Sequence, residues 1–284
     1  MKTYLDCIPC FLNQALRATR IATSDEAIQR KTMDLVLQIL PTLPLESTPP
    51  EIALEVYKIV YYTTANHDPY AEIKRESNQL ALSLYPKLKN IIETSLDPLL
   101  TTCKLSIAGN CIDFGPQEQY GDLETEIASA LESPLAIDFF EKFKKTMEAS
   151  SQVLYLGDNA GEILFDKIMI EQLNRDYNTH ITYVVRDKPI INDATMEDAI
   201  AVGLTDIVDV ISNGSIAPAT VLNQCSEQFL KLFEASDLII AKGQGNYESL
   251  SNENSKIFFF LKAKCALVAN QLNAKIGDMI LLNQ

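Results

Sequence analysis

The order of apolar and polar residues divides the chain into two parts. Up to about residue 100, apolar residues recur three and four positions apart, which is typical of amphipathic helices, and prolines separate the helical stretches. The clearest of these stretches are residues 28–39, 50–64 and 70–85. Since no stretch here has the pattern of a strand, we predict an all-helical domain over residues 1–100.

Beyond residue 100, short apolar runs alternate with helical patterns. The runs predict strands at residues 104–108, 153–156, 181–185, 207–211, 238–241, 256–261 and 279–282. Helices are expected between most of them, at residues 122–148, 161–174, 194–202 and 217–234. Strands that alternate with helices form a mostly parallel sheet covered on both faces. We therefore predict a Rossmann-like, three-layer α/β/α domain over residues 101–284, although residues 92–103 have no linker composition and fit either part.

Composition and charge narrow the class of protein and its partners. A hydrophobic content of 47% is that of a chain that forms a core. Acidic residues outnumber basic ones by 38 to 24, and the basic residues form no dense cluster, so nucleic acid and anionic membranes are not expected partners. The apolar runs are much shorter than the roughly 20 residues of a membrane helix, and the N-terminus has no signal-peptide pattern. We expect a cytoplasmic protein, and the sequence leaves its oligomeric state open.

Four of the predicted strands end in polar residues. In an open α/β sheet, ligands bind in the crevice outside the carboxyl ends of the strands, so these residues are expected to meet in one pocket. The run Gly-Asp-Asn-Ala-Gly-Glu over residues 157–162 is the most informative of the four. In chain order, the four ends supply Asn110 and Asp113; Asp158, Asn159 and Glu162; Arg186, Asn192 and Asp193; and Lys242 and Asn246.

The residue types at these ends suit a metal ion and a phosphate. Asp and Asn offer hard oxygen ligands, which favour magnesium, manganese or a similar cation over structural zinc. Lys242 supplies a positive charge, and neighbouring glycines let backbone N–H groups approach an anion. Each end alone also fits a plain turn, a helix N-cap or a solvated strand end, but the combination predicts a pocket for phosphate and metal. Because the lysine precedes the glycines and no third glycine follows, neither a P-loop nor a dinucleotide fingerprint is present.

At these residues the chain resembles the metal-dependent damage-control phosphatases, also called the acidic-residue methyltransferase-like family and formerly a domain of unknown function. The blocks Gly-Asp-Asn-Ala-Gly-Glu, Ile-Asn-Asp-Ala-Thr and Lys-Gly-Gln-Gly-Asn match that family in order and spacing. The resemblance covers essentially the whole chain. It includes an N-terminal Cys-x-x-Cys and residues 68–78, which are similar to the small prokaryotic and archaeal branch.

This resemblance implies a phosphatase that uses a divalent cation (magnesium, manganese, cobalt or nickel) and acts on small phosphorylated metabolites, such as sugar phosphates or damaged cofactor intermediates. It implies that the metal is bound by Asp158, Asn159 and Asp193. Lys242 and Asn110 would hold the phosphate, and Glu162 would position water or substrate. We take Asp158, Glu162 and Lys242 as the catalytic residues and expect the substrate to be bound by Asn110, Asp113, Arg186, Lys242 and Asn246.

The attacking group and the reaction class have alternatives. Asp158 fits a nucleophile, but the aspartyl-phosphate pattern has a second Asp two residues later, where this chain has Ala160; we therefore favour water activated by the metal. The family's second name suggests a protein-carboxyl O-methyltransferase, yet the first candidate turn carries Asp-Asn in place of the glycine-rich loop of a nucleoside cofactor. A module that binds a phosphorylated metabolite without turnover is the third hypothesis.

The cysteines and histidines raise separate questions. Cys7 and Cys10 have metal-ligand spacing and, together with Cys103 and Cys111, fit a structural zinc site between the two parts. We favour the alternative that Cys7 and Cys10 share one helix face as buried or reversibly oxidised thiols. Cys225 and Cys265 are expected to be ordinary buried thiols. His67 is expected near the cleft, and His180 on the surface.

Overall fold

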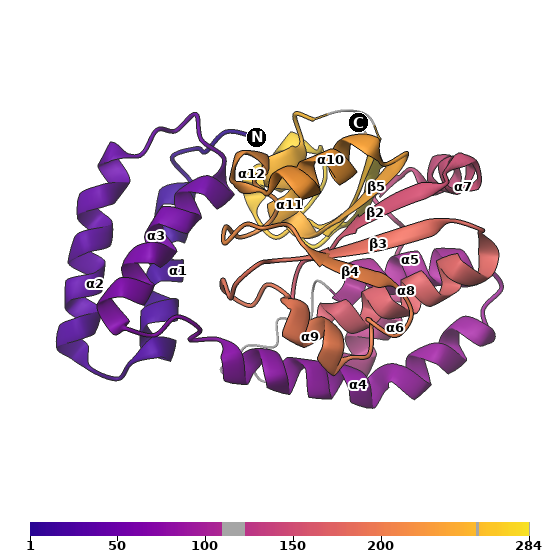
Figure 1. Ribbon diagram of the computed structural model, residues 1–284, viewed down its shortest axis with the longest axis horizontal. Helices are drawn as coiled ribbons and strands as arrows, with labels where there is room; N and C mark the ends of the chain where they lie inside the picture. The colour runs from indigo at the N-terminus through magenta and orange to yellow at the C-terminus, as the bar shows by residue number, and fades with distance from the viewer. Residues whose placement is uncertain (110–122, 254–255, 284) are drawn as a thin grey trace.

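A computed structural model describes residues 1–109, 123–253 and 256–283. At its centre is a seven-stranded sheet with the strand order β1-β7-β6-β5-β2-β3-β4 (Figure 1). Strands β6 and β7 pair antiparallel, whereas the remaining pairs are parallel. The strands are β1 Ile137–Asp138, β2 Gln152–Leu156, β3 His180–Val185, β4 Asp209–Ser212, β5 Leu238–Lys242, β6 Ile257–Lys262 and β7 Met279–Asn283.

Helices cover both faces of this sheet, which confirms the predicted Rossmann-like, three-layer α/β/α fold. Helices α4, α5, α7, α8 and α9 contribute to the core on one face, and α10, α11 and α12 to the core on the other. The helices are α1 Cys7–Ala22, α2 Glu26–Ile39, α3 Pro49–Thr64, α4 Ala71–Glu93, α5 Pro98–Gly109, α6 Leu123–Glu132, α7 Phe140–Ala149, α8 Glu162–Asp176, α9 Met196–Ala201, α10 Glu227–Ala235, α11 Gly243–Leu250 and α12 Ala266–Gln271, with 3₁₀ turns at Leu40–Thr42 and Leu222–Gln224.

The central strands are apolar on both sides because each of their faces is covered. Val153 and Tyr155 of β2 point into the core beneath α5 and α8, whereas Leu154 and Leu156 point into the core beneath α10 and α11. A strand buried on both faces reads as an unbroken apolar run rather than an alternating one. This is the pattern from which β2, β3, β5 and β6 were predicted.

Helices α1, α2 and α3 form a small bundle with a core of its own, seen at one end of the molecule in Figure 1. A capping box starts α3, where the Thr48 backbone N–H donates to Glu51 Oε2 over 2.7 Å. The long helix α4 connects the two parts, because Ile73 belongs to the core of the bundle and Leu88 to the core under the sheet. The predicted domain boundary at residue 100 stays a prediction, and the second half of α4 and all of α5 pack with the sheet.

Three of the predicted elements are wrong in type or extent. Residues 104–108 lie in helix α5 rather than in a strand; this helix is buried around most of its circumference, and a short apolar run does not separate a buried helix from a buried strand. Residues 122–148 are not one helix, since α6 and α7 flank the edge strand β1. Most of residues 217–226 precede α10 as irregular chain.

The strand order fixes where a ligand can bind. From β2 the chain runs outward to β3 and β4, and it then returns to β5 on the other side of β2. Such a reversal opens a crevice at the carboxyl ends of the two strands. Asp158 lies two residues after the end of β2, and Lys242 is the last residue of β5. In the described part of the chain, no helix is long and apolar enough to cross a membrane.

Candidate functional site

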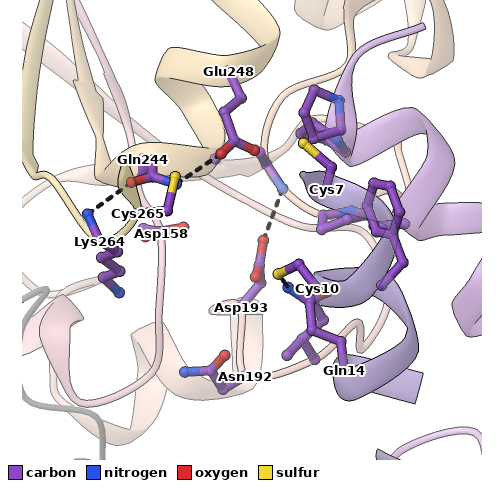
Figure 2. Close-up of a pocket in the computed structure, with 18 of the residues that line it drawn as sticks. Cys7, Cys10, Gln14, Asp158, Asn192, Asp193, Gln244, Glu248, Lys264 and Cys265 are labelled. Carbon is purple, nitrogen blue, oxygen red and sulfur yellow. Dashed lines mark hydrogen bonds between the residues drawn. The ribbon is translucent and has the colours of Figure 1, made fainter. Parts of the chain in front are cut away.

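A cavity of about 630 Å³ lies between the helical bundle and the carboxyl ends of the sheet strands. Figure 2 shows its two walls, with Cys7, Cys10 and Gln14 of α1 on one side and the loops after β2 and β3 opposite. Polar residues of both walls include Gln14, Ser77, Asp158, Asn159, Asn192, Asp193, Gln244, Glu248 and Lys264. The position agrees with the crevice predicted from the polar strand ends.

The loops after β2 and β3 are joined by backbone hydrogen bonds at the floor of this cavity. Ala160 N–H donates to Asn192 O over 2.9 Å, and Ala194 N–H donates to Asp158 O over 2.8 Å. Asn159 and Asp193 form an antiparallel bridge between these bonds. The backbone thereby brings Asp193 next to Asp158 and Asn159, which lie 35 and 34 positions earlier in the chain.

Asn159 and Asp193 are each oriented by their neighbours. The Asn159 amide Nδ2 donates to Asp158 Oδ2 over 3.0 Å and lies 3.3 Å from Glu162 Oε2. Its carbonyl oxygen is therefore the atom left for a cation. Asp193 Oδ2 accepts hydrogen bonds from Arg186 Nε over 2.8 Å and from Ala219 N over 3.0 Å, so Oδ1 is the oxygen of that carboxylate that a cation could bind.

These atoms fit a hard divalent cation in donor chemistry. Asp158 and Asp193 are 9% and 4% exposed, both line the cavity, and two carboxylates with one carboxamide make an all-oxygen set. Within the described ranges, no group of three or more His, Cys, Asp or Glu side chains is arranged to hold a metal ion. The predicted set differs from such a group because its third member is Asn159. Metal binding here stays a prediction.

Arg186 is buried behind the loops after β2 and β3 and does not line the cavity. Besides its bond to Asp193, it donates from Nη2 to Gly157 O over 3.1 Å. We predicted contact with substrate for Arg186, whereas the structure shows it fixing a predicted metal ligand and the end of β2. Its third guanidinium nitrogen, Nη1, is buried and has no hydrogen-bond partner among the described residues.

Lys242 is fully buried and is held by a network of charges and hydroxyls. Its ammonium donates to Glu162 Oε1 over 2.5 Å, to Asp166 Oδ1 over 2.7 Å and to Ser106 O over 2.8 Å. Glu162 and Asp166 lie one helical turn apart on α8 and face the same lysine. The structure therefore brings the predicted catalytic residues Glu162 and Lys242 into direct contact, and it adds Asp166. All three are buried, and none of them is among the residues that line the cavity.

The charges in this network shift the pKa values of its members. Burial raises the pKa of Glu162 to about 7, although the Lys242 ammonium lowers it, and the nearby Asp158 and Asp166 carboxylates raise it further. Burial disfavours the charged form of Lys242, but the two carboxylates outweigh that effect, so the pKa of Lys242 is raised above its ordinary value. Lys242 stays protonated at neutral pH, and Glu162 can exchange a proton there.

The remaining predicted substrate residues lie behind or outside the described cavity wall. Asn246 is fully buried, and its Nδ2 donates to Lys242 O over 2.7 Å and to Gly157 O over 3.3 Å. It therefore supports the backbone between β2 and β5. Asn110 and Asp113 lie outside the described residues.

The sequence analysis missed Asp166 and also Glu248 as members of the site. Glu248 lines the cavity and accepts a hydrogen bond from Gln244 Nε2 over 2.8 Å. Burial raises the pKa of Glu248 to about 7, which the Gln244 hydrogen bond opposes. The available signal was its place on α11, two residues after the predicted Asn246 and one helical turn after Gln244.

The helical part is bonded to the same loops through α4. Lys74 Nζ lies 2.8 Å from Asp198 Oδ2, and both side chains are nearly inaccessible. Asn78 donates to Asp198 Oδ1 over 2.9 Å and accepts from the Gly161 N–H over 2.7 Å. Gly161 starts α8 with a φ of 77°, which glycine adopts easily. The bundle is thereby tied to the loop that carries Asp158 and Asn159.

The cysteines are divided between the cavity and the core. Cys7 and Cys10 lie in the first turn of α1 and line the cavity. Cys7 is half-buried and Cys10 exposed, so the expectation that both thiols are buried is wrong, although partial burial raises the pKa of each. Cys103 is fully buried under the sheet, so it does not join them in the four-thiol site considered above, and Cys111 lies outside the described residues. Cys265 also lines the cavity, contrary to our expectation of an ordinary buried thiol. Zinc at Cys7 and Cys10 stays a prediction.

The two histidines take no part in this cavity. His67 is exposed and is not among the residues that line the wall, so our expectation of a histidine at the cleft is wrong for this cavity. His180 is exposed, as predicted, and its Nε2 lies 3.5 Å from Asp209 Oδ2.

The fold and the site define a doubly wound α/β protein with two carboxylates, a carboxamide and a buried lysine at its topological switch point. The damage-control phosphatase ARMT1-like domain matches residues 3–280. The chain belongs to this family. It is 36% identical to a damage-control phosphatase from Pyrococcus horikoshii, over 99% of this chain and 97% of that protein.

Two further comparisons agree with this membership. A damage-control phosphatase from Archaeoglobus fulgidus is 35% identical, with 96% of each chain covered. The crystal structure of a DUF89 family protein from Pyrococcus horikoshii superposes with a TM-score of 0.93 at 35% identity and covers 100% of this chain and 99% of that one. The family predicted from the three sequence blocks is thus confirmed.

Proposed function

We propose that this protein hydrolyses the phosphate esters of small metabolites with the help of a divalent cation. The observation that carries the proposal is the convergence of Asp158, Asn159 and Asp193 on the floor of one cavity, next to the Glu162–Lys242 pair. The names of the relatives from Pyrococcus horikoshii and Archaeoglobus fulgidus support a phosphatase. Sugar phosphates and damaged cofactor intermediates are the proposed substrates.

The residues take separate parts in this proposal. Asp158, Asn159 and Asp193 would hold magnesium, manganese, cobalt or nickel, which when bound stabilises charge on a phosphoryl oxygen and favours ionisation of water. Lys242 donates to a non-bridging phosphoryl oxygen and neutralises its charge. Glu162, with its pKa of about 7, accepts or returns the proton of the attacking water.

Water is the proposed nucleophile, with Asp158 as the alternative. Asp158 lies beside Asn159 Nδ2 at the cavity floor, and we assign it to the metal rather than to a covalent intermediate. An aspartyl phosphate trapped on Asp158 during turnover would reverse that assignment.

The substrate would reach this floor from the side of the helical bundle. The bundle contributes Phe11, Gln14 and Tyr57 to the cavity wall, whereas the proposed metal ligands all come from the sheet domain. Recognition of the non-phosphate part of the substrate is therefore assigned to the bundle, and the chemistry to the strand ends.

The test is release of inorganic phosphate from a panel of sugar phosphates and an aryl phosphate. The protein is first treated with a chelator, and each of the four metals is then added back separately, with Asp158→Ala alongside. Activity that metal restores in the native protein but not in the variant supports the proposal. If no metal gives release, hydrolysis is rejected; stabilisation by a phosphorylated ligand without turnover would then favour a binding module, and methylation of protein carboxyl groups would favour a methyltransferase.

A further inference from the structure

We infer that Asp166, clamped by Tyr155 and Tyr183, is a positioning residue that keeps the Lys242 ammonium charged and directed at the phosphate. The inference rests on the proposed function, because it concerns the phosphate partner named there. Asp166 and Lys242 are both fully buried, and neither is among the residues that line the cavity. The hydrogen bonds of Asp166 reach Lys242 and no cavity-lining residue of the described chain, so we assign it a role through Lys242 and not on the substrate.

The ammonium of Lys242 has no unused proton in this structure. A lysine ammonium has three donors, and they are directed to Glu162, Asp166 and the Ser106 carbonyl over 2.5 to 2.8 Å. To bind a phosphoryl oxygen, Lys242 must exchange one of these three acceptors for it. Which acceptor it gives up decides how the lysine works.

Asp166 is the acceptor that the surrounding structure holds in place. Its Oδ1 accepts from the Tyr155 hydroxyl over 2.7 Å and from Ser106 Oγ over 3.1 Å, and its Oδ2 accepts from the Tyr183 hydroxyl over 2.9 Å. The two tyrosine rings are stacked, with centroids 5.2 Å apart. They belong to neighbouring strands in which they are directly paired.

Glu162 is the acceptor on the side of the reaction. Its second oxygen, Oε2, lies 3.3 Å from Asn159 Nδ2, at the proposed metal site, whereas Asp166 lies one turn deeper on α8. Of the two carboxylates bonded to Lys242, Glu162 is therefore the one next to a residue that lines the cavity, and a phosphoryl oxygen held at the proposed metal site would approach the ammonium from that side. We therefore assign the exchange to Glu162, while Asp166 and Ser106 O keep their bonds to Lys242.

This exchange explains why the lysine needs two carboxylates. With Asp166 in place, Lys242 keeps a counter-ion after it leaves Glu162, and a buried ammonium without one is strongly disfavoured. Without Asp166, the ammonium would have only Glu162 as a charged partner, so a phosphate would have to compete for its last carboxylate. Removing the Asp166 charge is thus expected to weaken phosphate binding and turnover together.

The decisive variants are Asp166→Asn and Tyr183→Phe, with Glu171→Gln as the matched control. Glu171 is also a carboxylate of α8 bonded to a tyrosine and a lysine, Tyr85 and Lys89, but it lies away from Lys242. For each protein, calorimetry gives the affinity for Mn²⁺ alone and then for inorganic phosphate with Mn²⁺ present. Phosphate release from an aryl phosphate gives kcat and KM.

Asp166→Asn should lower phosphate affinity and kcat/KM by roughly 10- to 100-fold, the usual cost of losing an outer partner of a site. Tyr183→Phe should give a smaller loss of both. The Mn²⁺ affinity should stay within about twofold, because Asp166 has no hydrogen bond to a proposed metal ligand among the described residues. A general disturbance of the fold would lower the Mn²⁺ affinity as well, so this measurement separates the two causes. Glu171→Gln should change none of these values.

Unchanged phosphate affinity in folded Asp166→Asn overturns the inference, as does an equal loss in Glu171→Gln. If Asp166→Asn does not fold, Tyr183→Phe decides by the same comparison. If the native protein binds phosphate but hydrolyses no ester, the proposed function fails, while the comparison of phosphate affinities still tests Asp166. Native protein that binds no phosphate overturns the inference as well.

Discussion

The buried ion pair between α4 and α9 offers the sharpest test of how the helical bundle is held to the site. Lys74 and Asp198 lie 2.8 Å apart, with side chains that are 6% and 7% exposed. In Lys74→Met the ammonium is lost, and the Asp198 carboxylate stays buried. It keeps hydrogen bonds from Asn78 Nδ2 and from the N–H and hydroxyl of Thr195.

The expected loss in unfolding free energy depends on which partners the Asp198 carboxylate keeps in Lys74→Met and which it loses. Removing one partner of a buried pair typically costs about 3–5 kcal/mol, because the other charge is left without compensation. The three remaining hydrogen bonds place this case at the lower end, so we expect a loss of about 3 kcal/mol, or a fall in melting temperature of roughly 6–12 °C for a chain of this size. The pair Lys58–Glu55 is a suitable control, since it has the same 2.7–2.8 Å contact but side chains 50% and 38% exposed. Lys58→Met should cost less than about 1 kcal/mol.

Urea unfolding of the native protein, of both single variants and of Lys74→Met/Asp198→Asn measures these losses. The chain has no Trp and 11 Tyr, so tyrosine fluorescence and circular dichroism serve as two probes, and coincident transitions establish two-state behaviour. The double variant should recover stability relative to Lys74→Met, because the uncompensated charge is gone. A loss below about 1 kcal/mol in Lys74→Met, equal to that of Lys58→Met, would refute the argument from burial.

Three further predictions concern the site itself. Arg186→Lys cannot hold both Asp193 and the end of β2, so Mn²⁺ affinity by calorimetry should fall by roughly tenfold or more; an unchanged affinity would show that Asp193 needs no such support. Gly157→Ala would place a Cβ 2.2 Å from the Tyr183 hydroxyl oxygen and 2.6 Å from its ring carbon Cζ, so thermal unfolding should show a loss of about 1–3 kcal/mol. The same change should cost less in a Tyr183→Leu background, which lacks both atoms; an equal cost would contradict the contact as its cause. Burial raises the pKa of Glu248 from 4.5 to about 7, so the native state binds more protons than the unfolded state between these values, and stability falls as pH rises through that window. Glu248→Gln removes this pH dependence, so the free energy of unfolding of the variant relative to that of the native protein should increase between pH 5 and pH 8, by at most about 3 kcal/mol. A difference in urea unfolding that does not change with pH would contradict the raised pKa of Glu248.

The fold could largely be predicted from the sequence because the central strands are covered on both sides. Residues 153–156 and 238–241 are apolar without interruption and are bounded by polar or glycine-containing turns, and they became β2 and β5. The same feature caused the error at residues 104–108. Leu105, Ile107 and Ala108 are buried in helix α5, and an apolar run shorter than two helical turns carries no period.

The meeting of Asp158, Asn159 and Asp193 at one place was predictable for a reason that does not extend to their buried neighbours. Asp158 lies two residues after β2 and Asp193 lies in the loop that follows β3, and parallel strands deliver their ends to one edge. Asp166 lies inside α8, where a buried carboxylate has no local sequence signal. Its partners Tyr155 and Tyr183 look like ordinary core residues until the register of β2 and β3 places them side by side.

The groups proposed to meet the substrate are distinct from the buried residues that hold them in place. The atoms proposed to meet the substrate lie on loops and strand ends, whose backbone is fixed by bonds such as Ala194 N–H to Asp158 O. Their charges are balanced one layer deeper, by Arg186 behind Asp193 and by Asp166 behind Lys242. An uncompensated buried charge would be costly, and Asp193 and Lys242 are each paired with a buried residue that does not line the cavity. Variants of that deeper layer should therefore alter the strength of the site while leaving the shape of the cavity unchanged.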